Sequence, residues 1–301
     1  ARLPDVTVNA AKARAFLEAA AKWVRQSEAP AISENHTLKR RIDLALYKQA
    51  RLEEAAATPM SVGVYGASQA GKSYFVSALA KGKGESVFAR LGTREVNFLT
   101  DINPSGGKEA TGLVTRFTFQ TPADTPDFPI RISLLSEIDL VKIIANSFFE
   151  DLEPDAETDL TSRIARVQDI LGQDRAAGVA SVKVEDVVDL SFYCDKHFAT
   201  KPYYAALKQS GYWTRLEQLL PNTDLRGRQT LYSLLWDGSA PYDRLFEHLS
   251  EQLARFGGAS GLLCEPDALF DTEGGAWART ETSVINVVAL DSLGTEQERQ
   301  V

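Results

Sequence analysis

The chain has 301 residues, of which 44% are apolar and 25% are charged, a composition typical of a globular protein that is long enough for two compact units. Its net charge of -8 excludes a global positive field that would draw the protein to nucleic acid or to anionic lipid. With two cysteines, no run of about 20 apolar residues and no signal-peptide pattern, we expect no disulfide framework, no transmembrane segment and a cytoplasmic location.

Two amphipathic helices are expected at the start of the chain. Apolar side chains recur at three- and four-residue steps over residues 5–28 and again over residues 33–57, with Ser33 as the expected N-cap of the second helix. Pro30 and Pro59 separate these helices from each other and from the segment that follows. Such a pair can be plain packing against the next domain or a lever that senses the state of that domain, and the sequence leaves both open.

A phosphate-binding loop follows the second helix. Residues 61–65 predict a short apolar strand, residues 66–73 spell G-x-x-x-x-G-K-S, and residues 74–80 predict a helix, which is the context that this motif requires. Glycines let the backbone wrap a phosphate with its own N–H groups at the positive end of the helix. We expect Lys72 to reach the β- and γ-phosphates and Ser73 to ligate Mg²⁺. The expected nucleotide-binding residues of the loop are Gly66, Ala67, Ser68, Gln69, Ala70, Gly71, Lys72 and Ser73.

Further strands and a long helical segment come next. A strand is expected at residues 112–119, a turn with two prolines leads to a second strand at residues 130–135, and helical patterns run over residues 137–254. Strand character returns at residues 262–264 and 283–290. Four aromatic residues of the helical segment can belong to its core or form a surface for a partner, and the sequence leaves this open: Tyr203, Tyr204, Tyr212 and Trp213.

Two other segments complete the predicted site. The apolar run 284–290 is typical of a buried parallel strand and ends in Asp291-Ser-Leu-Gly294, where the carboxyl end of a strand would bring an aspartate to the phosphate loop. We expect Asp291 to hold Mg²⁺ and the Gly294 N–H to sense the γ-phosphate. Thr115, in the segment Thr111–Arg116, is the expected switch residue that closes onto Mg²⁺ when the γ-phosphate is present.

These motifs carry a family resemblance. The loop 66–73 together with Thr111–Arg116 resembles the first two GTPase motifs of dynamin-like proteins. The longer runs 62–73 and 98–117 are similar to bacterial virulence-factor proteins of the Srf operon type, the large C component. The close match covers about residues 60–120, with weaker similarity around the D-x-x-G segment. By this resemblance the phosphate, metal and switch roles fall on Lys72, Ser73, Thr115, Asp291 and Gly294.

The chain also departs from the dynamin pattern. Ser68 precedes Gln69, the reverse of the dynamin order, which leaves open which of the two places the attacking water; the expected catalytic residues are Ser68, Gln69, Lys72 and Thr115. The connection from Thr115 to Asp291 is far longer than in typical GTPases. No [NT]-K-x-D base-reading motif follows Asp291, so GTP rests on the resemblance alone, ATP stays open, and we expect the nucleotide domain to be truncated.

Together these features predict an α/β fold. The expected core is a P-loop NTPase sheet, mostly parallel with helices on both faces, joined to N-terminal helices and a large helical insertion. The expected segments are an N-terminal helical segment at 1–57, the first part of the nucleotide domain at 58–136, the helical insertion at 137–261 and the continued nucleotide domain at 262–301.

The expected function is that of a dynamin-like GTPase module in a bacterial, virulence-associated protein. It would bind and slowly hydrolyse GTP with Mg²⁺, and so switch the conformation of the attached helical regions. The alternatives are an ATPase on the same fold, or a scaffold or effector with a regulatory or silent nucleotide site. Expected partners are the nucleoside triphosphate and either other proteins or a second copy, without nucleic acid. Peripheral membrane contact and delivery out of the bacterial cytoplasm stay open.

Overall fold

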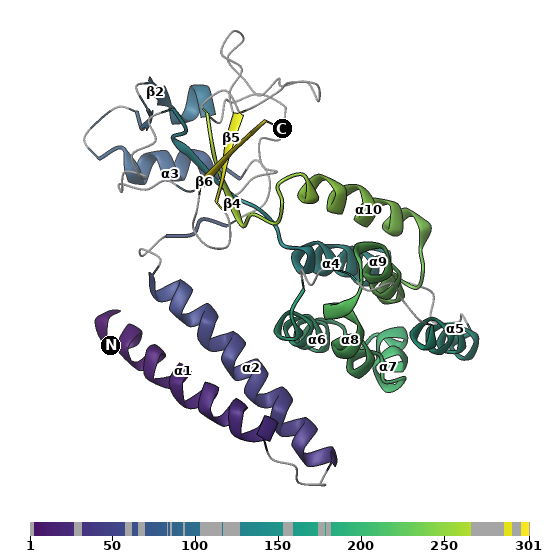
Figure 1. The fold of residues 1–301 in the computed structure, drawn as a ribbon. Coiled ribbons are helices and arrows are strands. Elements are labelled where there is room, and N and C mark those ends of the chain that lie inside the picture. Colours follow the sequence, from purple (N-terminus) through teal and green to yellow (C-terminus); the bar gives the residue numbers. More distant parts are fainter. Residues whose placement is uncertain are drawn as a thin grey trace. The chain divides into compact units, whose positions relative to one another are not determined.

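The computed structural model describes residues 3–26, 32–57, 62–65, 70–82, 84, 86–92, 94–102, 116, 127–152, 159–173, 178, 182–265, 286–290 and 296–300. Over these residues the chain is mostly helical and divides into two units (Figure 1). The helical unit comprises Ala1–Met60 and Leu135–Gln252, and the sheet unit comprises Ser61–Leu134 and Leu253–Val301.

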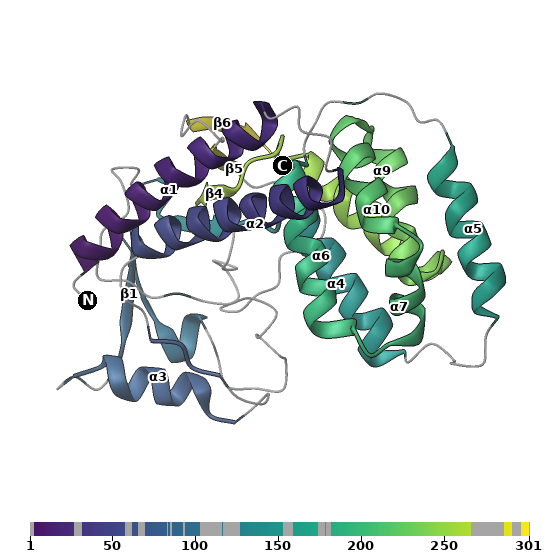
Figure 2. The same ribbon diagram turned by 90° about the horizontal axis from the view of Figure 1, so that it is seen from below.

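The helical unit begins with a hairpin of two long helices, α1 (Leu3–Gln26) and α2 (Ile32–Ala57), which lie side by side in both views of the ribbon (Figures 1 and 2). Both helices are confirmed, but α2 begins at Ile32, so Ser33 lies inside the helix and the predicted N-cap is wrong. Ala10, Ala21 and Ile42 are buried, and the Gln49 side chain donates a hydrogen bond to the Ala10 carbonyl at 3.0 Å. The buried side chains of α1 at this contact are small.

The rest of the helical unit is a bundle of short helices, which confirms the helical character predicted after residue 137. Several helices start at recognisable caps: Ser136 and Asp139 form a capping box, Asp224 accepts from the Gly227 N–H at 2.8 Å, and Pro202 opens another helix. The elements are α4 (Glu137–Asn146), the π-helix η2 (Ser147–Asp151), α5 (Leu160–Gly172), α6 (Val184–Phe198), α7 (Pro202–Gln209), α8 (Tyr212–Leu219), the 3₁₀-helix η3 (Leu220–Asn222), α9 (Leu225–Ser233), the 3₁₀-helix η4 (Leu234–Trp236) and α10 (Ala240–Ala254).

Aromatic side chains fill the centre of this bundle. Phe149 stacks on Phe198 with ring centroids 4.6 Å apart, and the buried hydroxyls of Tyr203 and Tyr212 donate to the carbonyls of Leu234 and Leu231, at 2.6 and 3.0 Å. Each buried hydroxyl thus has the partner that burial requires. The four aromatic residues left open by the sequence belong to this core, since each is at most 4% exposed: Tyr203, Tyr204, Tyr212 and Trp213.

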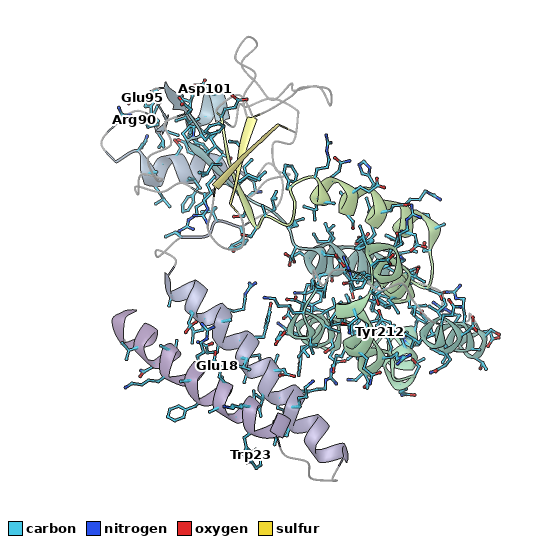
Figure 3. All side chains as sticks on the ribbon, in the orientation of Figure 1. Glu18, Trp23, Arg90, Glu95, Asp101 and Tyr212 are labelled. Atoms are coloured by element: carbon cyan, nitrogen blue, oxygen red, sulfur yellow. The ribbon has the colours of Figure 1, made fainter. Side chains whose placement is uncertain are left out.

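The sheet unit contains two antiparallel sheets. One is the hairpin of β1 (Phe88–Leu91) and β2 (Arg94–Asn97), in which Arg90 pairs with Glu95 across the strands (Figure 3). The other has the strand order β3-β4-β5-β6. The elements of this unit outside the hairpin are α3 (Lys72–Ala80), the π-helix η1 (Phe98–Ile102), β3 (Ile130–Ser133), β4 (Gly261–Cys264), β5 (Asn286–Leu290) and β6 (Glu296–Gln300).

Strands β3 and β4 are neighbours although the whole helical bundle separates them in sequence. The chain leaves the sheet after β3, forms α4 to α10 and returns as β4, with Ile130 opposite Cys264 and Ser133 opposite Gly261. Ile130, Leu262 and Cys264 form a small buried cluster, against which Leu134 and other partly buried apolar side chains pack.

The predicted fold class is wrong. Every strand pair among the described residues is antiparallel, β5 included, whereas a P-loop NTPase sheet is mostly parallel. The strand predicted at 61–65 is also absent from the described residues of that segment: Val62–Tyr65 is irregular, with Val62 84% and Tyr65 94% exposed. An apolar run shows that a strand has buried faces, but it does not fix the direction of its neighbours.

Candidate functional site

The described part of the predicted phosphate-binding loop runs from Ala70 into α3. Gly71 has φ 78° and ψ 16°, in the left-handed region that glycine adopts without strain. Its carbonyl accepts a hydrogen bond from the Phe75 N–H at 2.9 Å, so this turn passes directly into the helix. A Cβ added to Gly71 would meet no heavy atom within 4 Å. The glycine is therefore required for its backbone angles and not for space.

The first turn of α3 suits a negatively charged group. Ala70 and Gly71 are exposed, while Lys72 and Ser73 are half-buried and each makes an interaction within the chain. The turn contains no acidic residue. The N-cap residue is Gly71, which has no side chain to accept a hydrogen bond from the N–H groups of the turn. Since the N–H groups of a first helical turn point out of the helix at its positive end, this end of α3 favours an anion.

Helix α3 otherwise packs weakly for a helix of a nucleotide domain. Ser77 is its one buried residue, and Tyr74, Phe75 and Leu79 are 71%, 52% and 60% exposed. The helix contacts η1, which contains Asp101 (Figure 3). The Asp101 carboxylate accepts hydrogen bonds from the Asn97 N–H and from the Thr100 hydroxyl, both at 2.7 Å. Asp101 is thus held by local hydrogen bonds.

The other predicted site residues lie outside the described part of the chain. The structure therefore groups Ala70, Gly71, Lys72 and Ser73 at one helix end and leaves the remaining assignments as predictions. Those outside are Gly66, Ala67, Ser68 and Gln69 of the loop, the switch residue Thr115, and Asp291 and Gly294 of the D-x-x-G segment.

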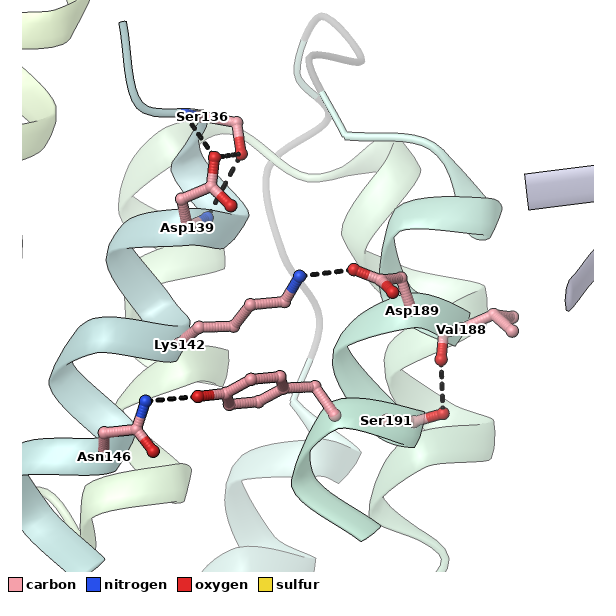
Figure 4. Close-up of polar contacts among 8 residues, drawn as sticks. Ser136, Asp139, Lys142, Asn146, Val188, Asp189 and Ser191 are labelled. Carbon is pink, nitrogen blue, oxygen red and sulfur yellow. Dashed lines mark hydrogen bonds and ion pairs between the residues drawn. The ribbon is translucent and has the colours of Figure 1, made fainter. Parts of the chain in front are cut away.

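A second group of polar side chains lies between α4 and α6 in the helical unit (Figure 4). Lys142 forms an ion pair with Asp189, and the Asn146 amide donates to the Tyr193 hydroxyl. The Lys142 ammonium also lies 5.4 Å from the centre of the Tyr193 ring. One turn further along α6, the His197 ring has its centre 4.5 Å from the centre of the Tyr193 ring. These residues are four apart on each helix, and that spacing is the sequence signal from which the cluster could have been inferred.

Helix α2 docks beside this cluster through polar contacts. Burial, together with the neighbouring carboxylate of Asp189, raises the pKa of Tyr47 to about 12. Arg40 forms an ion pair with Glu217 at 2.9 Å and donates to the Ser191 hydroxyl at 3.0 Å. Lysine, aspartate and tyrosine can perform acid–base chemistry, but here each is engaged by another member of the cluster. The arrangement joins three helices and presents no open reactive group.

Neither a metal cluster nor a membrane helix is evident in the described regions. No three His, Cys, Asp or Glu side chains converge there as metal ligands, and none of the described helices is both long and apolar enough to span a membrane. Cys194 is buried in the bundle, and burial raises the pKa of its thiol well above the ordinary value.

Comparison with known proteins places the chain in a family. Residues 20–301 match the family described as "Putative bacterial virulence factor". The chain belongs to this family. No significant match was found among curated proteins or among solved structures.

Membership confirms the bacterial virulence-factor resemblance at the level of the family. The match begins within α1 and spans both units, so the end of α1, the whole of α2, the bundle and the loop before α3 lie within the matched region. The family description names virulence and no chemistry. It therefore lends no support to the dynamin-like GTPase domain.

Proposed function

We propose that this virulence-factor family member binds the phosphates of a nucleoside triphosphate through the loop 66–73 and the first turn of α3. The observation that carries the proposal is the left-handed Gly71, which joins the G-x-x-x-x-G-K-S sequence directly to a helix N-terminus. A phosphate-binding loop depends on this combination, because its backbone N–H groups must converge at the positive end of a helix.

In this proposal each site residue has one role. Lys72 contacts the β- and γ-phosphates, and the Gly294 N–H senses the γ-phosphate. Mg²⁺ neutralises charge on the phosphates, and its ligands come from Ser73, Thr115 and Asp291. Of these three, Ser73 is the one in the described residues, and its place at the second position of α3 is the one that the motif assigns to the metal-binding hydroxyl.

The local geometry fits a phosphate group, and the sheet does not contribute to the argument. The loop end is exposed at Ala70 and Gly71, and the first turn of α3 carries no acidic side chain that would repel phosphate. Because the sheet is antiparallel, a fold-level analogy to nucleotide hydrolases gives no support. The assignment of GTP, and of slow hydrolysis that switches the helical regions, rests on the sequences Thr111–Arg116 and Asp291–Gly294.

Nucleotide titration with a matched pair of lysine variants tests the proposal. Fluorescent GTP and ATP analogues are titrated into the chain with and without Mg²⁺. Lys72→Ala is expected to weaken binding by about ten-fold or more, since the loop lysine carries the phosphate contact. Lys81→Ala is the control, because Lys81 is exposed at the C-terminal end of the same helix. Equal affinity of wild type and Lys72→Ala would overturn the proposal.

The base and the reaction need separate measurements. Calorimetry that shows tighter binding of ATP than of GTP would replace the GTPase assignment by the ATPase alternative. Phosphate release in the presence of Mg²⁺ measures hydrolysis, and Thr115→Ala and Asp291→Ala are expected to reduce it while leaving the folded structure intact. A wild-type rate equal to that of both variants would restrict the site to binding.

A scaffold with a silent nucleotide site is the second candidate. The observation in its favour is the exposure of large apolar side chains on the hairpin, with Phe16 at 77% and Trp23 at 65%. In that case Lys72→Ala would change neither nucleotide affinity nor the binding of a partner. Substitutions on the hairpin would weaken the binding of the partner.

A further inference from the structure

The hairpin exposes several large apolar side chains. Helix α1 buries Ala10 and Ala21, yet its larger side chains Phe16 and Trp23 are 77% and 65% exposed, and Val8 is 53% exposed. Figure 3 shows Trp23 projecting from α1 away from α2. On α2, Leu38 and Leu52 are 37% and 48% exposed. We call the surface formed by Val8, Phe16, Trp23, Leu38 and Leu52 the outer face of the hairpin.

These residues recur at the spacing of a coiled-coil seam. Phe16 and Trp23 are seven residues apart, and Leu38 and Leu52 are fourteen apart with Ala45 midway between them. Since each helical residue turns the direction by about 100°, a seven-residue step returns to within about 20° of the same direction. Phe16 and Trp23 therefore share one direction on α1, and Leu38, Ala45 and Leu52 share one direction on α2.

The bundle does not cover the row on α2. Leu38 and Tyr47 are nine residues apart, which places them on opposite sides of the helix. Tyr47 faces Asp189 of α6, and Arg40 on nearly the same side binds Glu217 of α8. The row that contains Leu38 and Leu52 consequently points away from α6 and α8.

The hydrogen bond between Gln49 and Ala10 fixes which residues of α1 and α2 lie beside each other along the hairpin. Because the helices are antiparallel, this bond places residue 52 near the level of Val8 and residue 38 near the level of residue 21, next to Trp23. The outer face thus extends over the full hairpin.

Among the described side chains of the hairpin, basic ones outnumber acidic ones. The described acidic side chains of the hairpin are held in ion pairs: Glu18 and Glu53 both bind Arg14, at 2.9 and 3.3 Å, and Asp43 lies 3.7 Å from Lys39. Exposed basic side chains remain on both helices, at Lys12, Lys22, Arg41, Lys48 and Arg51. This local sign is the opposite of the net charge of the whole chain, which is -8.

We propose that the outer face of the hairpin binds an acidic amphipathic helix of a partner protein. Apolar rows with seven-residue spacing fit the apolar face of another helix, and the basic side chains fit acidic residues that flank it. Two outer faces of the same chain would bring like charges together. A lipid bilayer needs no seven-residue spacing.

Two labelled peptides of about four heptads test the proposal. Both carry leucine at the a and d positions; one has glutamate and the other lysine at the e and g positions. Fluorescence anisotropy with the full chain is expected to show binding of the glutamate peptide and at least about ten-fold weaker binding of the lysine peptide. Arg41→Glu combined with Lys48→Glu is expected to reverse this preference.

Apolar variants provide the matched comparison. Phe16→Ser combined with Trp23→Ser is expected to weaken binding of the glutamate peptide by about ten-fold or more, because aromatic anchors dominate such contacts. Phe192→Ser combined with Leu245→Ser is the control; these residues are 40% and 44% exposed on α6 and α10. Circular dichroism checks that each variant keeps its helix content, which exposed positions are expected to allow.

Four results would overturn the proposal. They are equal binding of the two peptides, equal loss of binding in the hairpin and control variants, co-sedimentation with phosphatidylserine vesicles that requires Phe16 and Trp23, and a concentration-dependent dimer that Phe16→Ser abolishes. The last two would assign the outer face to lipid or to a second copy. None depends on whether the loop 66–73 binds nucleotide.

Discussion

Replacing Glu137 with alanine is expected to destabilise the helical unit strongly, because it leaves a buried guanidinium without its carboxylate. Arg228 on α9 is 5% exposed and donates from Nε and Nη2 to the two carboxylate oxygens of Glu137, at 2.8 and 2.9 Å. Its Nη1 donates to the Thr223 carbonyl at 2.7 Å. The substitution would thus remove the carboxylate and leave the bond to Thr223.

The size of the loss follows from the burial of the pair. Removing one member of a buried ion pair costs about 3–5 kcal/mol. The Glu137 side chain is 17% exposed, so water can reach part of the vacated space, and the lower end of about 3 kcal/mol applies. In a unit of 150 to 250 residues each kcal/mol corresponds to about 2–4 °C, which gives a fall in Tm of about 6–12 °C.

Thermal unfolding followed by far-ultraviolet circular dichroism measures this change. The double variant Glu137→Leu/Arg228→Leu removes both charges and is expected to recover most of the loss, since no buried charge is left without a partner. Glu18→Ala is the control, because its ion pair with Arg14 is exposed and should leave Tm unchanged within error. A double variant as unstable as Glu137→Ala, or a Glu137→Ala variant as stable as the control, would refute the reasoning.

Three further outcomes are expected. Burial raises the pKa of Cys264 to about 11 and that of Cys194 higher still, so neither thiol should react with a disulfide reagent at pH 8 until denaturant is added; rapid reaction in the folded protein would contradict this. The stabilisation from burying the protonated Tyr47 hydroxyl is complete below pH 10 and is lost as the pH rises towards about 12. The difference in absorbance titration between wild type and Tyr47→Phe should therefore have its midpoint near pH 12, and Asp189→Asn should lower that midpoint. A midpoint near pH 10 would be inconsistent with this prediction. Gly211→Ala should cost about 1–2 kcal/mol in urea unfolding, because φ is +83° there and alanine is strained at that angle, and an unchanged midpoint would count against it.

Helices were the easiest part of this fold to predict. The three- and four-residue steps of apolar residues at 5–28 and 33–57 correspond to α1 and α2, since the burial of one face of a helix leaves a direct trace in the sequence. Short apolar runs likewise predicted the segments that become β3, β4 and β5. Each of these predictions depends on residues close together in the chain.

Which strands pair, and in which direction, could not be predicted from the sequence. The strand direction was predicted from the unbroken apolar run that contains β5, but β4 is buried at all four residues and is nevertheless antiparallel to both neighbours. The β1–β2 hairpin was not predicted, although Gly92, with φ 61°, opens a two-residue connection between the strands and was a usable signal. The pair of Glu137 and Arg228 joins residues 91 positions apart, and no local pattern indicates it.

Phosphate binding by the loop does not depend on the parallel sheet that the sequence predicted. A parallel sheet would carry a phosphate loop and a magnesium aspartate to one edge, whereas the strands in the described part of the chain are antiparallel and give no reason to expect Asp291 beside Lys72. Phosphate binding itself needs less: a glycine at positive φ, an N-terminal helical turn without acidic residues, and a lysine beside it. Gly71 and α3 meet these conditions within a few residues of sequence. It follows that Lys72→Ala and Lys81→Ala test a local property, and that a nucleotide effect at Asp291 would be the first evidence that distant segments meet at this loop.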